Sequence, residues 1–91
     1  MSVENTLEER GNRYGQFAGH AQVSQDLKLM ISMHLRHRGK VLAADQQEAL
    51  EMICHKIARV INGDQDYADS WHDIAGYATL VEQRLEGKNA L

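Results

Sequence analysis

Apolar residues recur every three or four positions along most of the chain, which is the spacing of amphipathic α-helices. This spacing predicts three main helices, over residues 20–36, 45–62 and 67–85. A short polar helix that begins at Glu4 and ends near residue 10 precedes them. No segment alternates apolar and polar residues with the two-residue period of a strand. The sequence therefore predicts an all-α helical bundle, one domain over residues 1–91 with a core over 8–86 and frayed ends.

The helix expected over residues 45–62 has the most regular pattern. Asp45, with Glu48 three residues later, fits a capping box, and Asn62-Gly63 is a typical C-terminal stop. At about 100° per residue, one half of this helix is apolar and the other half is polar and charged. The polar half contains Glu48, Glu51, His55, Lys56, Arg59 and Asn62.

The helix expected over residues 67–85 has a core face and a second face with two acids. The predicted core face consists of Trp71, Ile74, Ala78, Val81 and Leu85. Asp69 and Asp73 lie on the other side with Tyr77, one turn apart, so they repel each other unless a cation or a basic side chain lies nearby. We therefore expect a functional site where the charged half of the preceding helix faces Asp69 and Asp73.

Composition narrows the class of protein. A chain of 91 residues buries little of its own surface, so we expect a homo-oligomer, a dimer or larger, whose chains complete the bundle. The single cysteine, Cys54, excludes a disulfide within the chain and is expected to be buried. No apolar run reaches the roughly 20 residues of a membrane span, and residues 1–10 do not resemble a signal peptide. These features predict a cytoplasmic protein without membrane contact, and the net charge of −3 argues against nucleic-acid binding.

Two pairs of carboxylates are expected on adjacent antiparallel helices, Glu48 with Glu51 and Asp69 with Asp73. Mg²⁺ prefers oxygen ligands and is usually held by one or two carboxylates together with phosphate oxygens of a substrate. The helix over residues 45–62 also carries basic residues that would neutralise phosphate charge, namely His55, Lys56 and Arg59. The alternative is that these residues form ordinary surface pairs one turn apart.

The segment Arg13-Tyr14-Gly15 lies in a predicted loop bounded by glycines. There the guanidinium and the aromatic ring would be free to contact a phosphate and a base. The alternative is a connector in which Tyr14 and Phe17 close the end of the bundle.

Three segments carry a resemblance to a known family: His55-Lys56-Ile57-Ala58-Arg59, Asn62-Gly63-Asp64 and Asp69-Ser70-Trp71-His72-Asp73-Ile74-Ala75-Gly76-Tyr77. With them, roughly residues 8–85 resemble an uncharacterised family of small phage and prophage proteins. That family is similar to the phage nucleotide-modification-associated domains and, more distantly, to the MazG-type all-α nucleoside triphosphate pyrophosphohydrolases.

The MazG-type enzymes hold Mg²⁺ with a Glu-x-x-Glu pair and a Glu-x-x-Asp pair and cleave between the α- and β-phosphates. Glu48 and Glu51 match the first pair and Asp73 matches the final acid, but Ser70 replaces the remaining acid, and Asp69 is one residue earlier. The resemblance implies a phage-derived nucleotide-binding protein, with pyrophosphohydrolase activity as its candidate reaction and Glu48, Glu51, Asp69 and Asp73 as catalytic and metal-binding residues. The ligand contacts would come from Arg13, Tyr14, His55, Lys56, Arg59, Asn62 and Tyr77.

The departure at Ser70 leaves two other hypotheses open. One is a non-catalytic phage accessory protein that binds and inhibits a host defence or replication protein in the host cytoplasm. The other is a nucleotide sponge, which binds its ligand without turnover.

Overall fold

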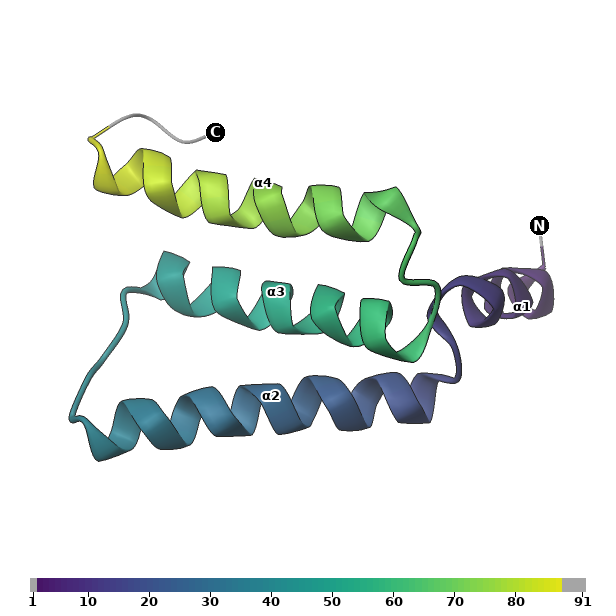
Figure 1. Ribbon diagram of the computed structural model, residues 1–91, viewed down its shortest axis with the longest axis horizontal. Helices are drawn as coiled ribbons and strands as arrows, with labels where there is room; N and C mark the ends of the chain where they lie inside the picture. The colour runs from purple at the N-terminus through teal and green to yellow at the C-terminus, as the bar shows by residue number, and fades with distance from the viewer. Residues whose placement is uncertain (1, 88–91) are drawn as a thin grey trace.

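The structure is a computed structural model that describes residues 2–87, and the described part of the chain contains four helices and no strand. The helices are α1 (Val3–Tyr14), α2 (Phe17–His37), α3 (Ala44–Asn62) and α4 (Ala68–Leu85). Figure 1 shows α2, α3 and α4 side by side in antiparallel order, with α3 in the middle and α1 projecting from one end. The prediction of an all-α fold is confirmed.

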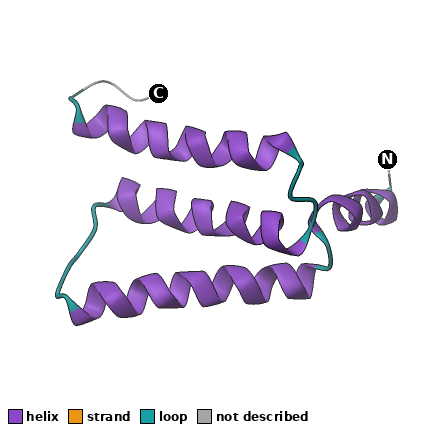
Figure 2. Cartoon of the chain, viewed as in Figure 1, coloured by secondary structure: helices purple, strands orange, loops and turns teal. Residues whose placement is uncertain are grey.

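The three long helices form a single layer (Figure 2). Within the described residues, α3 contacts both α2 and α4, whereas α2 and α4 do not contact each other. None of the described helices is both long enough and apolar enough to cross a membrane. Because α3 lies in the middle, one of its sides packs on α2 and the opposite side packs on α4. The two sides between them belong to the two faces of the layer.

The predicted end of α3 at Asn62-Gly63 is confirmed, and the helix begins directly after Ala43, within the predicted start, but the prediction of Asp45 as its cap is wrong. The N-cap is Ala43, whose N–H donates to Oε1 of Gln46 at 3.0 Å. Asp45 lies in the first turn and instead accepts two hydrogen bonds from the Arg84 guanidinium, at 2.6 and 2.8 Å. A tertiary ion pair has therefore replaced the local cap.

The predicted break between the first two helices is also too long. α1 continues through Gly11 as far as Tyr14, and α2 begins at Phe17. A glycine inside a helix costs only about 1 kcal/mol relative to alanine, so Gly11 does not end the helix. The chain turns at Gly15, whose φ of 78° is a conformation that favours glycine.

The C-terminal end of α3 holds the elbow between α1 and α2. The Asn62 side-chain amide donates to the carbonyl oxygens of Tyr14 and Gln16, at 2.9 and 2.8 Å. Gly63 packs directly against the backbone of Arg13 and Tyr14, where a Cβ atom would collide with the Arg13 carbonyl oxygen. Asn62 and Gly63 therefore join the first half of the chain to the second.

The core of a single chain is thin. Among the described residues, the buried apolar side chains are Ala49, Cys54 and Ala58, all of them small. Cys54 is buried, as predicted. The predicted core face of α4 is covered only in part: Ile74 and Val81 are half-buried, whereas Trp71 is 55% exposed and Leu85 is 60% exposed.

We predict that Gly63→Ala destabilises the fold by about 1–3 kcal/mol, the usual cost of forcing an extra methyl group into a packed site. Gly76→Ala is the matched control, because a Cβ atom at this position in α4 meets no atom within 4 Å. Alanine is the better helix former, so the control should gain about 0.5–1 kcal/mol. Urea denaturation of the two variants measures the difference, and equal effects would contradict the packing of Gly63 on the elbow.

Candidate functional site

The sides of α3 that face its two neighbours lie opposite each other. Asp45 and Lys56 pair with residues of α4, whereas Gln47 and Cys54 line a cavity beside α2. At about 100° per residue, these two pairs of residues point about 180° apart. α3 is therefore held between its neighbours and keeps two further sides free of them.

Those two further sides differ in chemistry. One side bears the charged and polar residues Glu48, His55 and Arg59, and we call the surface of the layer on this side the charged face. The other side bears Leu50, Ile57 and Ile61, of which Leu50 also lines the cavity beside α2, and we call the surface on that side the apolar face. The predicted division of this helix into a polar and an apolar half is thus a division between the two faces of the layer.

Lys56 and Asp73 form an ion pair between α3 and α4. The Lys56 Nζ atom lies 2.9 Å from Oδ2 of Asp73, and the lysine is 9% exposed. The hydrogen bond from Lys56 is the main cause that lowers the pKa of the Asp73 carboxyl below its ordinary value. The basic side chain that was expected near the two aspartates is therefore Lys56, which pairs with Asp73.

Two arginine–tyrosine contacts close the end of the layer where the elbow lies. The Arg59 guanidinium lies over the Tyr14 ring, 4.1 Å from its centroid. Arg13 lies over the Tyr67 ring at 4.8 Å and donates to the Tyr67 hydroxyl at 3.0 Å. Tyr14 thus has a structural contact at the bundle end, as one of the two predicted alternatives required. Phe17 is 78% exposed and its ring stacks on His20, with 6.0 Å between the ring centroids.

A pair of histidines lies beside Arg59. Nε2 of His20 is 3.1 Å from Nδ1 of His55, and the rings meet edge to face at 4.5 Å. Burial, and then the charge of Arg59, lower the pKa values of both rings, that of His55 to about 4. Both histidines are therefore neutral near pH 7, in a region where the surrounding charge is positive.

Sequence reasoning missed His20 and Tyr67. Both residues contact partners more than 30 positions away along the chain, so no local spacing marks them. With the predicted ligand residues they form what we call the basic cluster: Arg13, Tyr14, His20, His55, Lys56, Arg59 and Tyr67. Asn62 adjoins the cluster, but its amide is used to hold the elbow.

The predicted carboxylates do not meet at one point. The two ion pairs, Lys56–Asp73 and Asp45–Arg84, set the register of α3 against α4, so Asp73 lies level with Lys56. Glu51 and Glu48 are five and eight residues before Lys56, which is about 8 and 12 Å of helix rise. Asp69 lies a turn before Asp73 in α4, on the far side of that level from the two glutamates.

The individual acids have different surroundings. Glu51 accepts a hydrogen bond from the Gln47 amide at 2.7 Å, whereas Glu48 and Asp69 are exposed. Over residues 2–87, no group of three or more histidine, cysteine, aspartate or glutamate side chains is arranged to hold a metal ion. The closest approach to the predicted arrangement is the pair Glu48 and Glu51, one turn apart on α3.

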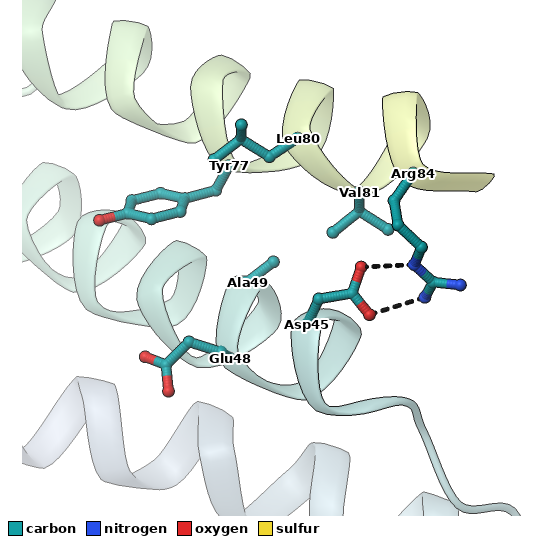
Figure 3. A pocket seen from close by; sticks show the side chains of 7 residues that line it. All are labelled: Asp45, Glu48, Ala49, Tyr77, Leu80, Val81 and Arg84. Carbon is teal, nitrogen blue, oxygen red and sulfur yellow. Dashed lines mark hydrogen bonds and ion pairs between the residues drawn. The ribbon is translucent and has the colours of Figure 1, made fainter. Parts of the chain in front are cut away.

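An apolar groove of about 500 Å³ lies between α3 and α4, along the turns of α4 that follow Asp73. Figure 3 shows Asp45 and Arg84 at one end of the groove and the Tyr77 ring at the other, while the Glu48 carboxylate points away from α4. The remaining lining residues are Ala49, Leu80 and Val81. Tyr77, a predicted ligand residue, therefore belongs to this groove and lies one turn from Asp73.

Comparison with family models identifies the family of the chain. A family model described as a domain of unknown function, DUF6378, matches residues 2–85. No curated protein and no solved structure matches the chain.

We predict that the free energy of unfolding decreases as the pH falls from 6.5 to about 4, by an amount on the order of 2 kcal/mol. Unfolded His55 takes up a proton near pH 6.5, whereas the folded ring stays neutral until about pH 4, so protonation favours the unfolded chain in this window. Urea denaturation at several pH values measures the slope. His55→Asn should reduce it and the exposed His72→Asn should not, and an unchanged slope in His55→Asn would refute this assignment.

Proposed function

The chain belongs to the DUF6378 family, and we propose that its basic cluster binds the phosphate groups of a nucleotide. Arg59 carries the proposal. Its guanidinium has no ion pair and no hydrogen bond with any residue that the structure describes, although it is partly buried against Tyr14. Five N–H donors held in this way match the geometry of a phosphate group, which a guanidinium binds through two parallel hydrogen bonds.

The other members of the cluster support the same ligand. Lys56 adds a second positive charge, and its ammonium group is held in place by Asp73. Arg59, Lys56 and Lys28 all contribute to the lowered pKa of His55, which shows that the local potential is positive. A bound phosphate would offset this potential, and every group of the cluster comes from one chain.

The apolar groove suits the base of such a nucleotide. Its tyrosine, Tyr77, lies one turn from Asp73 and hence near the Lys56 end of the cluster. Tyr14 is less suited to hold the base, because its ring is already covered by the Arg59 guanidinium. We therefore assign the phosphates to Arg59 and Lys56 and the base to Tyr77.

Mg²⁺ is the metal that we propose for this site. Glu48 and Glu51 fit it in number, since Mg²⁺ is usually bound by one or two carboxylates together with phosphate oxygens and water. Asp73 is engaged by Lys56, so the four-carboxylate arrangement of the MazG-type enzymes is not the one we propose. When bound, Mg²⁺ would neutralise phosphate charge and supply an acidic water for hydrolysis between the α- and β-phosphates.

The proposed role is therefore a phage-derived nucleotide pyrophosphohydrolase that acts on free nucleotides in the host cytoplasm. A nucleotide-binding protein without turnover is the second candidate. It is favoured by the separation of the two glutamates from Asp69 and Asp73 along the helices.

We predict that Arg59→Gln weakens the binding of nucleoside triphosphates about 10- to 100-fold. A hydrogen bond to a charged group contributes about 1.5–3 kcal/mol, and each 1.4 kcal/mol is a factor of ten in affinity. Arg36→Gln, in the exposed last turn of α2, is the matched control and should leave affinity unchanged. Titration calorimetry measures both. If the two variants lose affinity equally, the ligand responds to net charge and not to this site.

We predict that the protein with Mg²⁺ converts a nucleoside triphosphate to monophosphate and pyrophosphate, and that Glu51→Gln lowers this turnover at least 100-fold while triphosphate binding persists. Glu82→Gln, an exposed position of α4, is the control. Release of pyrophosphate from each of the common triphosphates measures the activity. Saturable binding without product would select the non-catalytic candidate. The proposal fails if neither turnover nor a Mg²⁺-dependent rise in melting temperature is seen.

A further inference from the structure

We propose that the apolar face packs against the same face of a second copy of this chain. The face extends over all three helices of the layer, through Met30, Leu50, Ile57, Ile61, Trp71 and Leu85. Met30 lies opposite Lys28 on α2, and Trp71 and Leu85 lie opposite Asp69 on α4, by the rotation of about 100° per residue. Lys28 lines a cavity together with Glu51 of the charged half of α3, which places Lys28 towards the charged face and Met30 towards the apolar one.

The apolar face is open in a single chain. Met30 is 56% exposed and Ile61 is 63% exposed, in addition to Trp71 and Leu85 of α4. Within residues 2–87 no helix covers them, because the neighbours of α3 lie beside it (Figure 1). Stable helical domains bury their apolar stripes against a second layer, and this layer has none of its own.

One chain exposes more surface to solvent than a compact monomer of the same mass would. The excess is at least as large as the area that one partner buries in a stable interface. The chain exposes 6700 Å², whereas a compact protein of its 10.3 kDa exposes about 5,400 Å². The excess of about 1,300 Å² is larger than the roughly 800 Å² that each partner loses in a stable interface of standard size. One chain therefore offers enough surface for a dimer.

The dimensions of the chain also favour a second copy on the apolar face. Its radius of gyration is 15.2 Å. A compact domain of 91 residues would have about 12 Å, and one of twice this length about 16 Å. A single layer of three helices is too wide for its own mass, and a second layer of the same size restores a compact shape.

A second copy fits the chemistry of this face. In the apolar half of α3 the only polar residue is Gln46, at the start of the helix, and the strip from Leu50 to Ile61 contains no charged residue. A twofold axis through this strip therefore brings no like charges of α3 together, as a face that pairs with itself requires along its centre. The exposed Glu82 of α4, on the same side of its helix as Trp71, would lie at the edge of the face. The charged faces then point outward, so the dimer has two complete basic clusters. This inference does not depend on the nucleotide.

The mass in solution, measured by light scattering after size exclusion, tests the proposal. The native chain should have twice the 10.3 kDa of one copy. Ile61→Lys should halve this mass, and Leu29→Lys should leave it unchanged, because Leu29 points away from α3 on the outer side of α2. The two side chains are 63% and 58% exposed, so neither change removes packing within one chain. A lysine at position 61 also suits the C-terminal end of a helix.

Three results would overturn the proposal. The first is a native chain with full helix content and the mass of one copy. The second is an Ile61→Lys variant that keeps the native mass, or the same loss of mass in Leu29→Lys. The third is a monomer whose apolar face is protected from hydrogen exchange only when a different protein is bound, which would assign the face to that partner.

Discussion

The structure depends on the central position of α3. Every contact between helices of the described chain, apart from the short elbow between α1 and α2, involves α3. Small residues on opposite sides of α3, Ala49 towards α4 and Cys54 towards α2, let both neighbours approach closely. The Asp45–Arg84 and Lys56–Asp73 pairs then fix how far α4 slides along α3, and Asn62 fixes the elbow.

This arrangement separates two requirements that compete in a small protein. A folded chain needs an apolar face that it can bury, whereas a phosphate site needs charged side chains that are partly shielded from water. Because α2 and α4 occupy opposite sides of α3, the remaining two sides meet these requirements separately. Lys56 shows the cost: a lysine that is 9% exposed has lost most of its contact with water, and the ion pair with Asp73 offsets this loss.

Helical periodicity predicted the charged and the apolar side of α3, although Lys56, expected on the charged side, points towards α4. It did not predict how far apart along the layer the residues of two helices lie. Glu48, Glu51 and Asp73 were expected together because all three lie on charged sides of adjacent helices. Their actual separation follows from the register of α4 on α3, which the Asp45–Arg84 and Lys56–Asp73 pairs set only in the folded chain. The histidine pair could not be predicted from the sequence for a related reason, since His20 and His55 meet only after α2 has packed on α3. Trp71 was expected in the core because an apolar stripe predicts burial, but the side chain is 55% exposed in a single chain.

The histidine pair gives the basic cluster a property that arginine and lysine alone lack. At neutral pH the rings of His20 and His55 are uncharged because burial and the nearby cations oppose protonation. If the cluster binds phosphate as proposed, the ligand would bring negative charge beside Arg59 and remove part of that opposition, so the pKa of His55 would rise when the site is filled. Binding and protonation would then be linked, and the same linkage would make the phosphate bind more tightly as the pH falls towards the raised pKa. The pH dependence of the proposed binding would therefore follow from how closely the phosphate approaches the His55 ring.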